Sequence, residues 1–318
     1  MADTVRIYRS LSEARSDFGP CALTIGNFDG VHAGHRRILR RVAAVAEERG
    51  LTPSALLFDP HPTRIVAPDR APRLMTTPEE RCVLMGGERI RQALILPFNR
   101  DVAALGPEEF IEKILVEALR ARVVLVGENF RFGNRAAGTT ESLRETGRRL
   151  EFDTEVVPAV KIRGREVSSS AIRKALGAGD VYRAGRMLER PFWLQGEVVR
   201  GHGIGAKQTV PTLNLRTAAE TLPRNGVYVT RTFDLDGAAR WPSVTNVGYR
   251  PTFGGDELSI ESFLLSGPLE GSAPGRIRVE FLRWLREERR FESPEALKAQ
   301  IFRDVARAQR YLRRVSKM

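Results

Sequence analysis

The segment that most constrains this chain is Leu-Thr-Ile-Gly-Asn-Phe-Asp-Gly-Val-His-Ala-Gly-His, residues 23–35. An apolar run over residues 22–25 is typical of a short buried strand, and a turn rich in Gly, Asn and Asp follows it. A helix is expected over about 36–49, because apolar side chains recur there at helical spacing. A strand, a glycine-bearing turn and a helix together are how α/β proteins hold a phosphate on backbone N–H groups at a helix N-terminus.

Two histidines, His32 and His35, lie where such a phosphate would bind. Each imidazole can donate a hydrogen bond to a phosphate oxygen, and Gly34 leaves room for a nucleotide to approach the backbone. The simpler alternative is a turn with two incidental surface histidines. The whole chain has only 4 histidines, so a chance pair in this context is disfavoured. The segment therefore predicts a phosphate site.

The His-Ala-Gly-His sequence resembles the H-x-G-H signature of the nucleotidyltransferase superfamily, whose members transfer a nucleotidyl group and release pyrophosphate. The longer string over 26–35 is similar to that of the bacterial bifunctional riboflavin kinase/FAD synthetases. The resemblance implies that His32 and His35 are catalytic and stabilise charge on the α- and β-phosphates of ATP while an acceptor phosphate attacks. Such chemistry needs positioning and charge stabilisation rather than a nucleophilic side chain. The resemblance also assigns ATP binding to Gly26, Asn27, Phe28, Asp29 and Gly34.

The length of 318 residues is enough for two domains, and 42% hydrophobic with 28% charged residues is typical of a globular protein. No apolar run reaches the roughly 18–20 residues of a membrane span, and the N-terminus lacks a signal-peptide pattern. We therefore expect a cytoplasmic protein without a membrane partner. Cys21 and Cys82 are too few for a disulfide framework, and Cys21 is expected to be a buried structural thiol.

The formal net charge of +12 invites a nucleic-acid interpretation. Against this interpretation, the arginines are scattered through expected helices, and the chain has no basic tail or low-complexity arm. Positive potential also attracts the phosphates of ATP and of flavin nucleotides. We expect no nucleic-acid partner, although charge alone does not decide the question.

Further apolar runs predict buried strands over 54–58, 93–98 and 123–126, and helices are expected to begin near Pro78 and Pro107. Repeated alternation of strands and helices is typical of a Rossmann-like, doubly wound and mostly parallel sheet. This fold class is our prediction for the first domain.

Polar or aromatic residues follow two of these strands, at the edge where open α/β sheets bind ligands. Asp59 and Pro60 follow one strand, and Asn129 and Phe130 follow another. On their own, the first pair predicts an ordinary proline-rich turn, and Phe130 with Phe132 could be a hydrophobic plug. The family resemblance implies instead that Asp59, Pro60, Asn129 and Phe130 bind the flavin of the adenylyltransferase.

The segment Ser168-Ser169-Ser170-Ala-Ile-Arg173 precedes or begins a helix. By itself it predicts an N-cap and nothing more. It is similar, position by position, to the nucleotidyltransferase segment that clamps the triphosphate. The resemblance therefore assigns ATP binding to Ser168, Ser169, Ser170 and Arg173.

Beyond about residues 185–192, short strands and turns replace the helix–strand alternation. We predict a domain boundary there, with an FMN adenylyltransferase domain over 1–187 and a riboflavin kinase domain over 188–318. The second domain is expected to be an antiparallel β-barrel with a terminal helix from Pro294 to about Val315. Its glycine-rich segment could be a flap over phosphates or only a hairpin loop, and the flap residues are Gly201, Gly203, Gly205 and Lys207.

The sequence Pro-Thr212-Leu-Asn214 resembles the riboflavin kinase signature. The resemblance implies that Thr212 and Asn214 hold Mg²⁺ against ATP phosphates, with the oxygen ligands that Mg²⁺ prefers. It also implies that Glu261 is the general base on the riboflavin 5′-hydroxyl, although an exposed strand glutamate is the alternative. The flap departs from the family pattern at four positions, which are His202, Ala206, Thr209 and Val210.

The expected function is therefore bifunctional flavin cofactor synthesis. ATP would phosphorylate riboflavin to FMN with release of ADP, and a second ATP would adenylylate FMN to FAD with release of pyrophosphate. We expect a monomer or a weak homo-oligomer. A nucleotidyltransferase for another acceptor would not explain Thr212, Asn214 and Glu261. Two alternatives remain: an enzyme with only one retained active site, and a non-catalytic flavin- or RNA-binding protein. The non-catalytic alternative predicts that His32, His35 or Glu261 is replaced, but all three residues are present.

Overall fold

The structure is a computed structural model, and it describes residues 4–199, 212–252, 255–265, 273–289 and 291–315. Contacts along the chain divide it into two compact units, Met1–Ser169 and Ser170–Met318. The predicted functional boundary after residue 187 differs from this division, and it stays a prediction. In the described part of the chain, no helix is long and apolar enough to cross a membrane.

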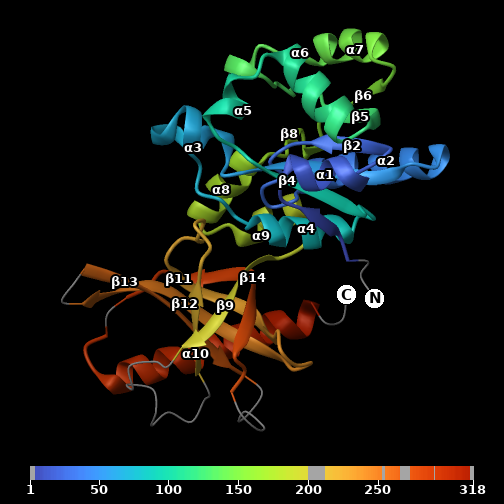
Figure 1. The fold of residues 1–318 in the computed structure, drawn as a ribbon. Helices are drawn as coiled ribbons and strands as arrows, with labels where there is room; N and C mark the ends of the chain where they lie inside the picture. Colours follow the sequence, from blue (N-terminus) through green and yellow to red (C-terminus); the bar gives the residue numbers. More distant parts are fainter. Residues whose placement is uncertain (1–3, 200–211, 253–254, 266–272, 290, 316–318) are drawn as a thin grey trace. The chain divides into compact units, whose positions relative to one another are not determined.

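The first unit is built on a six-stranded sheet in the order β1-β4-β3-β2-β5-β6 (Figure 1). Every neighbouring pair in it runs parallel, so the carboxyl ends of all six strands lie along one edge. The prediction of a parallel doubly wound sheet is confirmed. The strands are β1 (Arg6–Tyr8), β2 (Cys21–Ile25), β3 (Thr52–Asp59), β4 (Gln92–Pro97), β5 (Ala121–Gly127) and β6 (Asp153–Val157).

Alternate side chains of these strands enter two separate cores, one on each face of the sheet. On β5, Val124 and Val126 pack into one core, whereas Val123 and Leu125 pack into the other. The first core is covered by α1 (Leu11–Asp17), α6 (Pro107–Phe110), η2 (Ile111–Ala118) and α7 (Thr140–Arg149). The second core is covered by α2 (Ala33–Arg49) and α4 (Pro78–Gly86). Cys21 is fully buried, as predicted.

Short elements connect these layers. They are α3 (Pro62–Val66), η1 (Pro68–Arg70), α5 (Arg100–Ala104), η3 (Asn134–Ala136) and a two-stranded pair of β7 (Lys161–Ile162) and β8 (Arg165–Glu166).

The start of α2 corrects one prediction. The helix begins at Ala33, not near residue 36, because His32 is its N-cap: the Nδ1 atom of His32 accepts a hydrogen bond from the His35 backbone N–H. Histidine is not among the usual capping residues, so no capping signal at this position could be read from the sequence. The start of α4 is confirmed, with Thr77 as N-cap in a reciprocal capping box with Glu80.

The second unit is a closed six-stranded barrel in the order β10-β13-β12-β11-β14-β9, antiparallel between the described neighbours, as predicted. Its strands are β9 (Phe192–Val199), β10 (Thr212–Thr217), β11 (Gly226–Asp234), β12 (Arg240–Thr252), β13 (Gly255–Leu264) and β14 (Arg276–Arg286). The helices of this unit are α8 (Ser169–Gly177), α9 (Val181–Leu188) and α10 (Pro294–Val315). The terminal helix has the predicted bounds, and the Ser293 hydroxyl accepts a capping hydrogen bond from the Ala296 N–H.

The barrel strands have two different faces. One face carries a chain of fully buried hydroxyls, each within 2.9 Å of the next, which is formed by Thr232, Ser243, Thr230, Thr245 and Ser262 in that order. Every member of this chain has a partner, so its burial leaves no polar atom unsatisfied. On the opposite face, Val227, Val229 and Val244 pack under Ala308 of α10. Strand residues that alternate with the hydroxyls therefore lie on the outer face of the barrel.

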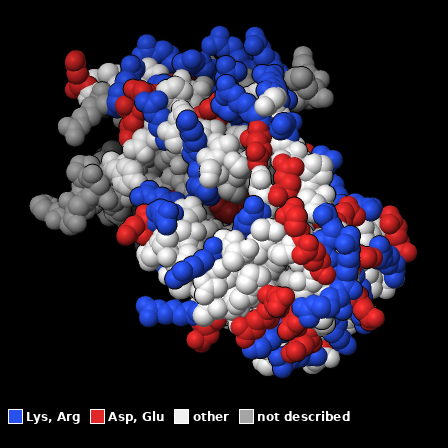
Figure 2. All heavy atoms as spheres, turned by 90° about the horizontal axis from the view of Figure 1, so that it is seen from above, with Lys and Arg blue, Asp and Glu red and all other residues white. Residues whose placement is uncertain are grey.

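Acidic and basic side chains are interspersed on the face shown in Figure 2, although basic ones are more frequent, as a net charge of +12 requires. Exposed ion pairs such as Arg49–Asp153 and Arg89–Glu47 also place opposite charges side by side in the first unit. Exposed pairs of this kind stabilise a fold by only about 0–1 kcal/mol each. The two-faced burial of the strands is therefore the main source of stability in the first unit.

We predict that Gly196→Ala destabilises the barrel. A Cβ at Gly196 on β9 would lie 1.9 Å from the carbonyl oxygen of Arg216, so one of the two paired strands has to move. We expect a loss on the order of 2–3 kcal/mol in the free energy of unfolding, measured by urea denaturation. The matched control is Gly177→Ala at the end of α8, where a Cβ would meet nothing within 4 Å. Equal stability of the two variants would contradict the prediction.

Candidate functional site

The two predicted catalytic histidines lie together at the N-terminus of α2. Their rings are stacked, with centroids 3.6 Å apart and planes inclined by 16°. Because Nδ1 of His32 accepts the capping hydrogen bond, the proton of its neutral ring is on Nε2. His32 is only 6% exposed, so the ring is held in place by both the cap and its surroundings. The pair therefore presents fixed imidazoles beside the positive end of a helix.

His35 is kept neutral by its surroundings. Its ring packs between His32 and the edge of Phe28, whose centroid is 5.1 Å away. Loss of water from the ring, then repulsion by His32 and by Arg81, lower the pKa of His35 well below its usual value. The buried Nδ1 atom of His35 has no hydrogen-bond partner among the described residues. A neutral imidazole can still donate one N–H to a phosphate oxygen.

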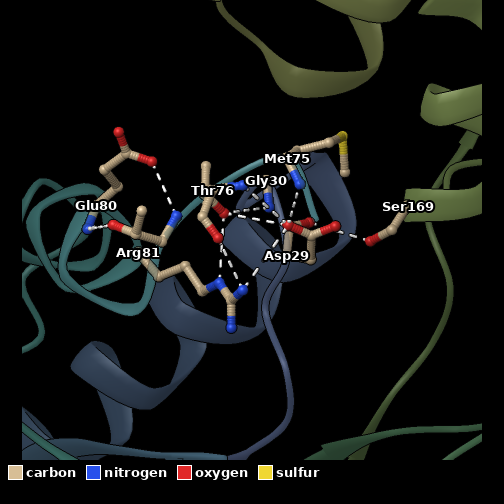
Figure 3. Close-up of polar contacts among 8 residues, drawn as sticks. Asp29, Gly30, Met75, Thr76, Glu80, Arg81 and Ser169 are labelled. Carbon is tan, nitrogen blue, oxygen red and sulfur yellow. Dashed lines mark hydrogen bonds and ion pairs between the residues drawn. The ribbon is translucent and has the colours of Figure 1, made fainter. Parts of the chain in front are cut away.

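The turn between β2 and α2 is held from behind by the start of α4 (Figure 3). The Asp29 carboxylate is 3% exposed and accepts hydrogen bonds from the backbone N–H groups of Met75 and Thr76. The Thr76 hydroxyl also donates to Asp29 and accepts from the N–H of Gly30. Asp29 therefore holds the turn internally, and its predicted role in ATP binding stays a prediction.

The predicted flavin residues lie at the same sheet edge. Asp59 ends β3 and Asn129 follows the end of β5, and these strands flank β2 on its two sides. Both residues are exposed, whereas Pro60 is half-buried. Phe130 is half-buried too and stacks on Phe132, with the ring centroids 5.5 Å apart. The parallel topology thus gathers these residues around the turn that carries the histidines.

A hydrogen bond within the first unit connects the serine segment to the histidine turn. The Ser169 hydroxyl donates to the Asp29 carbonyl oxygen at 3.0 Å (Figure 3). Ser170 and Arg173 belong by their contacts to the second unit, where an Arg173 N–H donates to the Ser170 hydroxyl. Ser168 and Ser169 are half-buried. The triphosphate role of all four residues stays a prediction.

In the barrel, three polar residues form a row across neighbouring strands. Asn214 of β10 is directly opposite Glu261 of β13, and Glu261 is directly opposite Asn246 of β12. Directly opposed residues project from the same side of a sheet, and this row alternates with the buried hydroxyls, so it lies on the outer face. Thr212 is two residues before Asn214 and therefore shares that face. The predicted metal ligands and the predicted base are thus adjacent.

Two neighbouring side chains orient this row. The Ser259 hydroxyl donates to a carboxylate oxygen of Glu261 at 3.2 Å, and the Asn246 amide donates to Glu288 at 3.0 Å. Thr212, Asn214, Asn246 and Glu261 are all half-buried, so each can reach a ligand and still be fixed by packing. The predicted flap, Gly201 to Lys207, lies outside the described residues.

Comparisons with known proteins bear on both sites. Residues 14–171 match the FAD synthetase family model, and residues 188–312 match the riboflavin kinase family model. A bifunctional riboflavin kinase/FMN adenylyltransferase of Pseudomonas fluorescens is 36% identical over 307 residues, which cover 96% of this chain and 97% of that protein. The enzyme of the same name from Escherichia coli K12 is 35% identical over 96% of this chain and 97% of its own length.

The chain belongs to the bifunctional riboflavin kinase/FMN adenylyltransferase family. It is accordingly an enzyme with both transferase activities, and ATP and flavins are its substrates. A solved structure from Streptococcus pneumoniae, titled a macrolide-efflux protein, has 26% identity and a TM-score of 0.84, covering 96% of this chain and 99% of that one. The efflux function named in that title belongs to that protein.

Sequence analysis missed two parts of these sites. Asn246 was not singled out, because strand register cannot be obtained from one sequence. Thr76 and Arg81 were not singled out either, although Thr76 accepts a hydrogen bond from Gly30 of the histidine turn and the Arg81 guanidinium is 4.0 Å from the Asp29 carboxylate. No sequence signal could have found Arg81, because the burial of a charged residue is not visible in a sequence pattern.

We predict that Gly34→Ala lowers adenylyl transfer without unfolding the protein. Alanine favours an α-helix over glycine by about 1 kcal/mol, so stability should be unchanged or higher. A Cβ at Gly34 would lie 3.2–3.3 Å from ring atoms of His32, so the ring has to shift. We expect at least a tenfold loss in the kcat of FAD formation from FMN, measured by chromatography. Riboflavin kinase activity of the same variant is the control, and unchanged FAD formation would contradict the prediction.

Proposed function

We propose that residues 1–187 adenylylate FMN and that residues 188–318 phosphorylate riboflavin, each with the site residues assigned above. The family match of each half supports this division of labour. The observation that carries the first assignment is the stacked, capped histidine pair at the carboxyl edge of the parallel sheet. The observation that carries the second is the Asn214–Glu261–Asn246 row.

In the adenylyl transfer, a phosphate oxygen of FMN attacks the α-phosphorus of ATP. A new P–O bond forms, the bond between the α-phosphorus and the bridging oxygen breaks, and pyrophosphate leaves. Neutral His32 and His35 donate N–H groups to the α- and β-phosphate oxygens as charge develops there. The N-cap bond holds His32 in the required tautomer, so little reorganisation accompanies the reaction.

In the kinase reaction, the riboflavin 5′-hydroxyl oxygen attacks the γ-phosphorus of ATP. Its proton passes to the Glu261 carboxylate, the bond from the γ-phosphorus to the bridging oxygen breaks, and ADP leaves. The hydrogen bond from Ser259 orients Glu261 for this role. Asn246, opposite Glu261, is a further polar group in reach of the same side of the sheet.

The residues present fit a magnesium ion that would bind together with ATP. Thr212 and Asn214 supply two neutral oxygens from one face of β10, and the phosphates supply the anionic ligands. Among the described residues, no group of three His, Cys, Asp or Glu side chains could hold a metal by itself. Such a site binds Mg²⁺ together with the nucleotide, and the ion supplies charge neutralisation on the transferred phosphate.

The remaining expectations are also part of this proposal. We infer a cytoplasmic enzyme that acts as a monomer or weak homo-oligomer and has no nucleic-acid partner. The interspersed acidic side chains of Figure 2 support the last point, because a nucleic-acid surface is usually a continuous basic patch.

The test of the two assignments uses one chain and two variants. With riboflavin, ATP and Mg²⁺, the wild type should give FAD, His32→Ala should accumulate FMN, and Glu261→Gln should leave riboflavin unchanged. Glu261→Gln should still convert added FMN to FAD at the wild-type rate. We expect losses on the order of 10²–10⁴-fold in the affected step. If His32→Ala forms FAD normally, or if the wild type uses only one flavin, the corresponding site assignment is wrong.

The magnesium proposal makes a separate prediction. Asn214→Leu keeps the shape of the side chain but removes its oxygen, so kinase activity should fall at least tenfold and need more Mg²⁺ for half-maximal rate. FMN adenylylation by the same variant should not change. The control is Asn99→Leu, which removes the amide cap of α5 in the first unit and leaves β10 untouched. An unaltered Mg²⁺ requirement in Asn214→Leu would exclude this ligand.

A further inference from the structure

The turn that precedes α2 contains strained backbone. Phe28 and Val31 have positive φ angles of 50° and 41°, and Gly30 between them has a φ of 77°. Positive φ is rare for a β-branched residue such as Val31, and it persists only where the surrounding structure enforces it. His32 follows directly, so the backbone of this turn fixes where the capping imidazole begins.

Thr76 is the group that enforces the turn. Its hydroxyl accepts a hydrogen bond from the Gly30 N–H at 2.9 Å and donates to the Asp29 carboxylate at 3.2 Å. The same Asp29 oxygen accepts the Thr76 N–H, so the two segments are joined at three points. Both side chains are buried, at 6% and 3% exposure, so water does not compete for these bonds.

Thr76 is held in turn by Arg81, one turn into α4 (Figure 3). The Arg81 Nε–H donates to the Thr76 hydroxyl, and its Nη2–H donates to the Thr76 carbonyl oxygen at 2.8 Å. The guanidinium is 4.0 Å from the Asp29 carboxylate, and Arg81 is only 1% exposed. Burial of an arginine is costly, so its complete enclosure here requires this specific set of partners.

We propose that Arg81 is a positioning residue of the adenylyltransferase site, acting through Thr76 and Asp29 to hold the backbone of residues 28–31 and thereby to aim His32 and His35 at the phosphates. The inference rests on the proposed role of the two histidines. It adds a buried cation that touches neither ATP nor flavin, and it connects the start of α4 to catalysis in α2.

An electrostatic effect accompanies this positioning. The titratable groups that face His35 are the neutral ring of His32 on its own helix and the Arg81 cation on α4, and the Asp29 carboxylate is 4.0 Å from Arg81. Repulsion by the Arg81 cation helps keep the pKa of His35 low, so the ring stays neutral at mildly acidic pH. Removal of the cation should raise the pKa of His35. The acid limb of adenylyl transfer should then move to higher pH, because His35 becomes protonated sooner as the pH falls.

The experiment compares Arg81→Met, Arg81→Lys and Thr76→Val in the full-length enzyme. Arg81→Met and Thr76→Val should each lower the kcat of FAD formation from FMN by about 10²-fold, with the KM for ATP changed less than threefold. The double variant Arg81→Met/Thr76→Val should be no slower than the slower single variant, because both residues act through the same hydrogen bonds to the turn. Arg81→Lys should recover at least a tenth of the wild-type rate. Only the loss of charge in Arg81→Met should shift the acid limb of the pH profile upward.

Riboflavin kinase activity of each variant reports that the chain is folded and active elsewhere. The matched surface control is Arg9→Met, which breaks an exposed pair with Glu79 at the same helix and should change neither rate nor pH profile. Wild-type kcat with an unmoved acid limb in Arg81→Met overturns the proposal. A wild-type rate of FAD formation in Thr76→Val also overturns the proposal, and this outcome can be read even if Arg81→Met is unstable. Failure of wild type or of His32→Ala to behave as proposed would instead overturn the histidine assignment itself.

Discussion

The hydrogen bond from the His35 backbone N–H to Nδ1 of His32 is the interaction on which the adenylyltransferase site depends. A helix N-cap is fixed by backbone geometry, so the His32 ring, proposed to be catalytic, has little freedom left as a cap. The bond assigns the remaining proton of His32 to the nitrogen that faces away from the helix, and it brings His35 into a stack on the same ring. One bond therefore sets position, tautomer and spacing together.

The capping bond fixes the His32 ring only if the preceding turn is rigid. A rigid turn of this conformation lowers the stability of the fold. Left-handed φ angles at two non-glycine residues cost of order 1–3 kcal/mol each, and a buried arginine adds a desolvation cost. The two cores on the faces of the sheet offset such costs, since β2 itself is completely buried. The strain is thus localised at the carboxyl edge, where the chemistry takes place, and the stability comes from the strands behind it.

The sequence allowed the architecture to be predicted, because local periodicity identified the main strands. Each candidate motif is continuous along the chain and could therefore be found in the sequence, but the roles of the site residues stay predictions. The sequence analysis did not find contacts between distant segments. Asn246 joins Glu261 only through barrel register, and Arg81 reaches the histidine turn only after α4 packs on the same core as α2. The predicted start of α2 was wrong, because His32 caps the helix through a ring nitrogen. Residue preferences for helix caps do not indicate how a histidine ring is oriented.

The two sites solve related problems with different scaffolds. Both reactions move a phosphorus centre between oxygens, so neither needs a nucleophilic side chain, and both depend on holding charge in place. In our proposal the first site does so with neutral imidazoles at a helix N-terminus, where burial and the Arg81 cation disfavour a charged His35 ring. The proposed second site does so with the side-chain oxygens of Thr212 and Asn214 on a barrel face, where strand register places the Glu261 carboxylate opposite Asn214. In each case the polar groups are fixed by backbone pairing, a cap in one and a strand register in the other. Substitutions that disturb that pairing should therefore affect catalysis more than equal changes at exposed loops.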